Sequence, residues 1–327
     1  MVTLILAAAA AFALSALIGR FLIPALRALK AGQAIREIGP EWHNVKAGTP
    51  TMGGLMFIAA GLICTVAFGW PDMVAGRMDH LYVFAFAMIY GLIGFLDDFM
   101  KVKYKRNLGL TALQKFALQV AVAGCFLALM RYNGNLKSEL YIPFWNVTVP
   151  VAWPVYLIFA TLVAVGCVNA VNLTDGIDGL AAGVTIPVMA FFAVTAYLWK
   201  MESVAIVPAA MIGALLGFLV YNFHPAKVFM GDTGSLFLGG LVCGLAFALD
   251  VPLILVLVGL VYLAETLSVM MQVTYFKLTH GKRIFKMTPI HHHFEMCGWS
   301  EVKIFAVFTL ITAAMCVLAW FGVAGRF

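Results

Sequence analysis

Charged residues are scarce in this sequence. Lys, Arg, Asp and Glu together make up 11% of its 327 residues, whereas 63% are hydrophobic, and the mean hydropathy is +0.99. A soluble globular domain carries about 25% charged residues. The composition therefore excludes a soluble domain and indicates an integral membrane protein.

Several other features are missing. The six cysteines lie in or beside apolar segments without paired spacing, which indicates neither a disulfide framework nor a Cys-based zinc site. Strand-like alternation is absent, and a backbone that crosses lipid must then be helical. No basic region precedes the first apolar run and no A-x-A cleavage site follows it, so a retained first helix is expected. Because no long linker or internal repeat is visible, residues 1–327 are expected to form a single domain.

Apolar segments of about 20 residues are abundant, and each is long enough to cross a membrane as a helix. Ten can be drawn, at 2–26, 52–70, 80–96, 111–130, 151–171, 180–199, 204–221, 234–249, 253–277 and 302–324. They predict an all-α polytopic membrane protein with about ten transmembrane helices. Residues 131–150 form a longer connection, whose Val147, Thr148 and Val149 predict a small hairpin.

The basic residues predict how the chain is oriented in the membrane. If the N-terminus is outside, 16 of the 21 Lys and Arg residues fall on inner loops and helix ends. Basic residues favour the cytoplasmic side, so both termini are expected to be extracytoplasmic. The net charge of +6 then reflects membrane topology, and no nucleic-acid partner is expected.

The same topology places the unusual polar motifs on the cytoplasmic side. In the stretch 172–180, two acids and two glycines interrupt an apolar run, where a charge is costly in lipid. On a helical turn Asp175 and Asp178 would share one face, and Gly176 would let a ligand approach the backbone closely. An ordinary loop between membrane helices can also contain such D-G turns.

Two further acidic motifs lie on the same side. Asp97 and Asp98 end the third segment, and adjacent acids gain most from a divalent cation or basic partners. The alternative is a solvated helix end that faces the basic cluster 101–106. Asp232 lies in the glycine-rich stretch 222–235, which suits either phosphate binding at a helix N-terminus or an ordinary helix cap. Because Mg²⁺ favours carboxylate and phosphate oxygens, the acids together predict a magnesium site.

Histidines and a deep acid complete the list of candidates. Consecutive residues on a helix point in different directions, so His291, His292 and His293 are not expected to share one metal. Hydrogen bonding to a phosphate or a base is more plausible for them. Glu265, near the middle of the ninth segment, predicts a broken helix or a water-filled groove rather than a lipid-facing position.

Lysines beside these acids define the chemistry. Lys46 and Lys115 can be topology charges, but beside a metal and a diphosphate they would offset oxyanion charge. From the residues alone we infer a magnesium-assisted phosphoryl-transfer site at the cytoplasmic membrane surface, with a lipid-borne acceptor. The competing class is an ion-coupled transporter, because intramembrane acids also mark ion paths. A transporter, however, places its acids near mid-bilayer and usually shows repeat symmetry.

Six motifs carry a resemblance that covers essentially the whole chain. They are G-T-P-T-M-G-G (48–54), G-F-L-D-D (94–98), N-A-V-N-L-T-D-G-I-D-G-L-A (169–181), V-F-M-G-D-T-G-S-L (228–236), A-E-T-L-S-V (264–269) and P-I-H-H-H-F-E (289–295). Through them the chain closely resembles the phospho-N-acetylmuramoyl-pentapeptide transferases, within the polyprenyl-phosphate N-acetylhexosamine-1-phosphate transferase superfamily. Sister transferases that use UDP-GlcNAc differ in the histidine motif, and they are the alternative enzyme class.

The resemblance implies a reaction and an architecture. Undecaprenyl phosphate would attack UDP-MurNAc-pentapeptide, giving lipid I and UMP for peptidoglycan biosynthesis, with Mg²⁺ as cofactor. The family also implies ten transmembrane helices, a ninth helix broken near Glu265, a homodimer, and a multi-pass location in the bacterial cytoplasmic (inner) membrane with the active site on the cytoplasmic face.

The resemblance also implies roles for individual residues. Asp232 would be the principal magnesium ligand, Asp97 would activate the lipid phosphate, and Asp98 would support the metal and phosphate region. The matching nucleoside-binding stretch comprises Asn172, Asp175, Gly176, Ile177 and Asp178. Further nucleotide or inhibitor contacts match Asn222, Phe229, Gln272 and His292. Polar site positions without an assigned role match Lys46, Thr51, Lys115, His291 and His293. On this basis the 172–180 stretch is expected to hold the uridine end of the donor rather than the metal.

Overall fold

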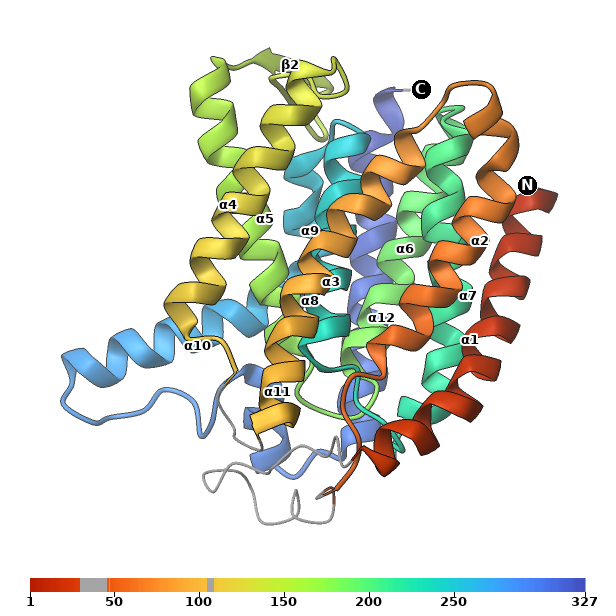
Figure 1. Cartoon of the computed structure of the whole chain (residues 1–327). Helices are drawn as coiled ribbons and strands as arrows, with labels where there is room; N and C mark the ends of the chain where they lie inside the picture. The colour runs from red at the N-terminus through yellow and green to blue at the C-terminus, as the bar shows by residue number, and fades with distance from the viewer. Residues whose placement is uncertain (30–45, 47, 105–108, 327) are drawn as a thin grey trace.

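The computed structural model of this protein describes residues 1–29, 46, 48–104 and 109–326. Most of these residues are helical, and two short strands form a hairpin at one end of the helical bundle (Figure 1). In chain order the elements are α1 (Val2–Ala28), α2 (Gly54–Val74), α3 (Asp79–Tyr104), α4 (Ala112–Tyr132), β1 (Glu139–Ile142), β2 (Val147–Pro150), α5 (Trp153–Thr174), α6 (Leu180–Leu198), α7 (Glu202–Asn222), α8 (Gly231–Ala248), η2 (Pro252–Ile254), α9 (Leu255–Val258), α10 (Leu260–Leu278), α11 (Ile290–Met296), α12 (Glu301–Val323) and η3 (Ala324–Arg326).

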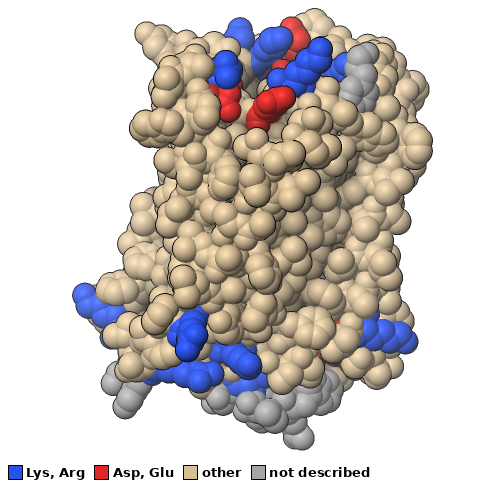
Figure 2. Space-filling model, turned by 90° about the vertical axis from the view of Figure 1, so that its right-hand side faces the viewer, with Lys and Arg blue, Asp and Glu red and all other residues tan. Residues whose placement is uncertain are grey.

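The membrane-spanning helices confirm the predicted architecture. Within the described residues, nine helices are long and apolar enough to cross a membrane, and one bent pair raises the number to ten. The face of the molecule in Figure 2 has a wide band without charged side chains, and the charged groups lie at its two ends. Such a band is what a protein surrounded by lipid presents to the hydrocarbon core.

The third helix is longer than its predicted apolar segment. The segment was drawn to residue 96, where the charges begin, but α3 continues to Tyr104. Within this extension Lys101, one turn further on, forms an ion pair with Asp97, which supports the helix.

The ninth predicted span is broken, as expected. The helical pair Pro252–Val258 and Leu260–Leu278 bends by 81°, and Gly259 stands between its two parts. The break precedes Glu265, which lies in α10 and is fully buried rather than exposed to lipid. Beyond the bend, α10 extends sideways from the bundle at the end opposite the hairpin (Figure 1).

Both chain termini lie toward the hairpin end of the bundle (Figure 1). The predicted hairpin is confirmed: β1 and β2 pair antiparallel, with Glu139 opposite Pro150 and Ile142 opposite Val147. The buried hydroxyl of Tyr141 donates to the Gly322 carbonyl at 3.3 Å, which ties the hairpin to α12. Lys30, Arg36, Lys105 and Arg106, which contribute to the predicted charge bias, lie outside the described residues.

One close helix contact positions the polar end of the molecule. A Cβ atom added to Gly94 in α3 would overlap the backbone carbonyl of Asp232 in α8. Because glycine has no side chain, the two backbones can touch at this point. Asp97 and Asp98 follow within one turn of Gly94, so this contact brings acids from two distant parts of the chain together.

Candidate active site

Three carboxylates meet where α3 approaches the start of α8. Asp97 and Asp98 come from α3 and Asp232 from the first turn of α8, and one oxygen of each lies within 4.8 Å of the others. Asp97 is 3% exposed and Asp98 is 2% exposed, so the alternative of a solvated helix end is wrong. All three groups offer carboxylate oxygens, the ligand type that Mg²⁺ prefers. The cluster therefore suits a hard divalent cation.

Two lysines compensate the charge of this acidic cluster. Lys101 Nζ lies 2.6 Å from Asp97 Oδ2 and 3.1 Å from Asp232 Oδ2. Lys115 Nζ lies 2.7 Å from the same Asp232 oxygen. Burying unpaired carboxylates is costly, and when all three carboxyls are ionised, two ammonium groups leave one net negative charge. The cluster can therefore accept additional positive charge, and its lysines can turn to an incoming phosphate.

Lys101 was not among the predicted site residues. Its i,i+4 relation to Asp97 was the available signal, but the basic cluster 101–106 was interpreted as topology charge. Only the fold shows that Lys101 also reaches Asp232, which is 131 residues away in the chain.

Hydrogen bonds hold the two acids of α3 in fixed orientations. Asp98 Oδ2 accepts from the backbone N–H of Thr233 at 2.9 Å and from its hydroxyl at 2.7 Å. Asp97 Oδ1 accepts from the backbone N–H of Leu110 at 2.7 Å, in the connection that leads to α4. Charge-assisted bonds of this kind are stronger than neutral ones, so the carboxylates are preorganised rather than mobile.

The 172–180 stretch adjoins this cluster through its first residue. Asn172 Nδ2 donates to Asp232 Oδ1 at 2.9 Å and to Ser235 Oγ at 2.7 Å. Helix α5 ends at Thr174 and Asp175 caps it, so the expected single helical face for Asp175 and Asp178 is wrong. The two acids belong instead to different surroundings.

The pKa of Asp175 is raised by burial and by the nearby acidic cluster. Desolvation by the surrounding protein raises the pKa of Asp175 to about 8, and the negative charges of Asp232, Asp98 and Asp178 act in the same direction. The raised pKa means that Asp175 holds a proton near neutral pH, and a protonated carboxyl can donate a hydrogen bond.

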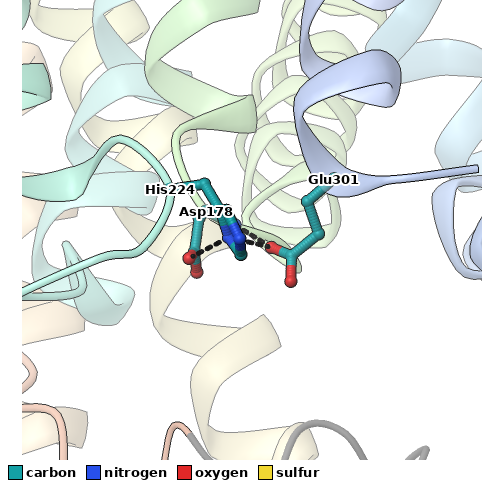
Figure 3. Close-up of side chains that lie close together, drawn as sticks. All are labelled: Asp178, His224 and Glu301. Atoms are coloured by element: carbon teal, nitrogen blue, oxygen red, sulfur yellow. Dashed lines mark hydrogen bonds and ion pairs between the residues drawn. The ribbon is translucent and has the colours of Figure 1, made fainter.

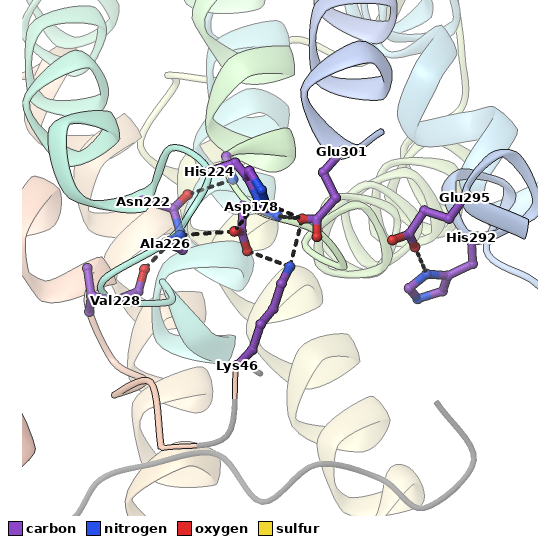
Figure 4. A network of polar contacts seen from close by, with 10 residues as sticks. Lys46, Asp178, Asn222, His224, Ala226, Val228, His292, Glu295 and Glu301 are labelled. Carbon is purple, nitrogen blue, oxygen red and sulfur yellow. Dashed lines mark hydrogen bonds and ion pairs between the residues drawn. The ribbon is translucent and has the colours of Figure 1, made fainter. Parts of the chain in front are cut away.

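Asp178 belongs to a second polar group, which also contains His224 and Glu301 (Figure 3). Asp178 Oδ2 lies 3.0 Å from His224 Nδ1 and accepts from the Ala226 N–H at 2.9 Å. Lys46 Nζ lies 2.7 Å from Asp178 Oδ1 and 2.7 Å from Glu301 Oε2 (Figure 4). The fold thus brings Lys46 and Asp178, two of the predicted site residues, into direct contact. His224 and Glu301 were not among the predicted site residues, and only the fold brings them to Asp178.

Two predicted contact residues act as internal braces in this structure. Asn222 is 2% exposed, accepts from the Gly179 N–H at 3.1 Å and donates to the Val228 carbonyl at 2.9 Å. Gln272 Oε1 accepts from the backbone N–H groups of residues 284 and 285 at 3.0 and 2.9 Å. These bonds fix the loops that surround the site.

Thr51 and Phe229 lie where an early loop meets the segment before α8. The Phe229 N–H donates to the Pro50 carbonyl at 2.9 Å, which pairs the two segments. A Cβ atom built on Gly231 would lie 2.6 Å from Thr51 Oγ1 and 2.5 Å from Asp98 Oδ2. Thr51 is therefore adjacent to the acidic cluster.

The first histidine of the triplet packs directly on the 172–180 stretch. His291 is fully buried, and its Nδ1 lies 3.0 Å from Glu265 Oε2, which is also fully buried. Its Nε2 has no hydrogen-bond partner among the residues that the structure describes, and a Cβ atom added to Gly176 would overlap this ring. The His291–Glu265 pair explains why the acid Glu265 is tolerated deep in α10.

The other two histidines have different partners. His292 Nδ1 bonds to the carboxylate of Glu295, and His293 Nδ1 accepts from the backbone N–H of Lys286 at 3.2 Å. The described residues contain no metal-ligand group made from the three histidines.

An apolar groove leads along the membrane-facing surface to the acidic cluster. It has a volume of about 1040 Å³ and runs between α4 and α5. Its lining is mostly apolar and includes Phe116, Val120, Leu157 and Leu162. Lys115 also lines it and forms the ion pair with Asp232, so one side chain links the groove to the acids.

Fold and site define a class: a polytopic membrane protein with a buried carboxylate and lysine cluster at one end of its helical bundle, reached by an apolar groove. Comparisons with known proteins narrow this class. The family model described as Glycosyl transferase family 4 matches residues 80–250. The phospho-N-acetylmuramoyl-pentapeptide-transferase signature 1 matches residues 46–58, which include Lys46 and Thr51.

Curated relatives match almost the whole chain. The phospho-N-acetylmuramoyl-pentapeptide-transferase of Caldanaerobacter subterraneus is 47% identical over 311 residues, covering 94% of this chain and 95% of the relative. The proteins of the same name from Staphylococcus carnosus and Clostridium acetobutylicum are 45% and 44% identical, covering 96% and 94% of this chain and 97% and 95% of the relatives. The chain belongs to the phospho-N-acetylmuramoyl-pentapeptide-transferase family. It is therefore an enzyme, and the transporter and UDP-GlcNAc alternatives are set aside.

Proposed function

We propose that this protein transfers phospho-MurNAc-pentapeptide from UDP-MurNAc-pentapeptide to undecaprenyl phosphate, giving lipid I and UMP in peptidoglycan biosynthesis. The observation that carries the proposal is the cluster of Asp97, Asp98 and Asp232 with two lysines, at the end of an apolar groove. Phosphoryl transfer requires charge neutralisation and positioning. A water-insoluble acceptor requires an apolar path to that point.

The α4–α5 groove is the proposed path for the acceptor. Its apolar lining suits an isoprenoid tail, and Lys115 at the acidic cluster suits the phosphate that ends the tail. A phosphate monoester has a second pKa of about 6, so it is largely ionised near neutral pH. A strong general base is therefore not required, and Asp97 acts by orienting the phosphate. Direct attack on the donor phosphorus needs no covalent enzyme intermediate, and trapping one would contradict this preference.

The donor is proposed to lie between the two polar groups. Its uridine end contacts the 172–180 stretch, near Asp178 and Lys46, and its diphosphate faces the acidic cluster. Lys101 and Lys115 then exchange carboxylate oxygens for phosphate oxygens, which offsets the charge that develops on the leaving UMP. Mg²⁺ held by Asp232, with Asp97 and Asp98 beside it, would add charge neutralisation at the diphosphate.

The proposal includes the membrane context. The polar end that carries α10 and α11 faces the cytoplasm, where the nucleotide donor is soluble, and both termini face the other side of the bacterial inner membrane. The positive bias of the predicted inner loops supports this orientation. The homodimer remains a prediction, which light scattering of the purified protein in detergent tests.

One assay tests the reaction. The purified full-length protein is incubated with Mg²⁺, undecaprenyl phosphate and either UDP-MurNAc-pentapeptide or UDP-GlcNAc, and UMP release is measured. We expect release only with the first donor, and no release with it would overturn the proposal. Asp232→Asn should abolish turnover without unfolding the protein, whereas Asp79→Asn, at the far end of α3, should leave turnover unchanged. Near-wild-type activity of Asp232→Asn in Mg²⁺ would refute its assignment as the principal ligand.

A further inference from the structure

The contacts of the Glu301 side chain are not explained by its local sequence. It is the first residue of α12, and Ser300 caps this helix by accepting from the Lys303 N–H. An acid in the first turn of a helix usually serves the helix dipole. Here the side chain instead extends away from its own helix, is only 9% exposed, and reaches residues from two other parts of the chain.

One carboxylate oxygen of Glu301 joins two proposed donor-binding elements. Oε2 accepts from Lys46 Nζ at 2.7 Å and from the backbone N–H of Asp178 at 3.0 Å. Lys46 Nζ also donates to Asp178 Oδ1 at 2.7 Å. Lys46, Asp178 and Glu301 therefore form a closed triangle of charge-assisted bonds (Figure 4). Bonds of this type are about twice as strong as neutral ones.

His224 completes the support of this triangle. Its Nδ1 lies 3.0 Å from Asp178 Oδ2 and 3.8 Å from Glu301 Oε2. With the Ala226 N–H on the same Asp178 oxygen, both oxygens of Asp178 are engaged. Glu301 is different, because its Oε1 has no hydrogen-bond partner within the described parts of the chain. Figure 3 shows one oxygen of Glu301 turned away from Asp178 and His224.

We propose that Glu301 is a positioning residue of the donor site, which holds Lys46 and the 177–179 backbone in the arrangement that receives the nucleotide. This inference rests on the proposed function. Glu301 has no bond to Asp97, Asp98 or Asp232 among the described residues, so it acts on donor binding and not on the transfer step. Its loss removes one of the two carboxylates that hold Lys46 and, at the same time, the acceptor of the Asp178 N–H, because both groups bond to the same Glu301 oxygen.

The test separates donor binding from catalysis. Glu301→Gln keeps the size and the acceptor for the Asp178 N–H but removes the charge that faces Lys46. We expect it to raise the KM for UDP-MurNAc-pentapeptide and the Kd for UMP about tenfold, the effect of about 1.4 kcal/mol. The kcat and the KM for undecaprenyl phosphate should stay within twofold of the wild type. Glu301→Ala, which removes both bonds, should raise the donor KM further.

Controls distinguish this role from a general structural one. Ser300→Ala weakens the start of α12 without touching the triangle, and Glu139→Gln makes the same charge change in the exposed hairpin. Neither should change the donor KM. If Ser300→Ala raises it as much as Glu301→Gln does, or if Glu301→Gln lowers kcat at unchanged donor KM, the proposal is overturned. If Glu301→Ala does not fold, the donor KM of the isosteric Glu301→Gln variant decides the proposal alone.

A double-mutant cycle tests the pairing with Lys46. If the two side chains act through each other, the donor KM of Lys46→Met/Glu301→Gln should be close to that of Lys46→Met alone. Multiplicative effects would overturn the pairing. A wild-type protein that releases no UMP would instead refute the proposed function itself, so the two failures are distinguishable.

Discussion

The contact between His291 and Gly176 gives the sharpest prediction from this structure. A Cβ atom added to Gly176 would lie 2.5 Å from His291 Cε1 and closer still to Nε2. Carbon atoms in ordinary contact are about 3.5–4.0 Å apart, so the imidazole ring in Gly176→Ala must retreat by about 1 Å. The ring is fully buried and bonded to Glu265 at 3.0 Å, and therefore cannot retreat without loosening that bond.

The expected cost of Gly176→Ala follows from this geometry. Overpacking of a filled interior costs about 1–3 kcal/mol of unfolding free energy. A shift of the His291 ring by about 1 Å next to the 172–180 stretch should also lower kcat/KM for the donor about 100-fold. Thermal unfolding of the detergent-purified protein and UMP release measure the two effects separately.

Two further variants decide whether the steric contact is the cause. In α5, a Cβ added to Gly166 would have no atom of the described residues within 4 Å apart from the adjoining backbone of its own helix, so Gly166→Ala should not lower thermal stability. Removing the ring in Gly176→Ala/His291→Ala should destabilise the protein by less than the sum of the two single changes. Wild-type stability and turnover in Gly176→Ala would refute the packing of His291 against the 172–180 stretch.

Two other predictions concern stability. Asn222→Ala leaves the buried Gly179 N–H and Val228 carbonyl without their partner, and should cost about 1–3 kcal/mol in denaturant unfolding; unchanged stability would contradict its role as a brace. For Asp175, the folded-state pKa of about 8 is above the ordinary value of 3.8, so the folded protein holds this proton more tightly than the unfolded chain does. Stability without Mg²⁺ should therefore fall as pH rises from about 4 to about 8, and the unfolding temperature of Asp175→Asn should depend less on pH. A wild-type and Asn variant with the same pH dependence would exclude the raised pKa.

Much of the fold could be predicted because lipid imposes simple rules. Apolar runs long enough to span the bilayer must become helices, and ten such runs gave the nine long helices and the bent pair. The acid at Glu265 predicted a departure from a regular lipid-facing helix, and the break is present next to Gly259. The extension of α3 to Tyr104 was not predicted, because hydropathy stops at the first charges whereas helical hydrogen bonding does not.

The site was predictable only in part. Acids and lysines in an apolar chain are conspicuous, so Asp97, Asp98, Asp232 and Lys115 were found without a structure. Lys101 had a local signal, its i,i+4 spacing from Asp97, but its charge was attributed to the membrane topology. Glu301 had none, because an acid after a capping serine is typical of any helix start.

The sequence by itself determined the all-helical membrane architecture, the number of spans and the residue types from which the site is built. These properties depend on composition and on the length of each apolar run, which are local. The tertiary structure decided which charges face one another. It removed the shared helical face of Asp175 and Asp178 because α5 ends at Thr174, and it joined Asp178 to Lys46 and Glu301 across more than 120 residues on each side. Such pairings depend on how close two backbones can come, and a single sequence does not record that distance.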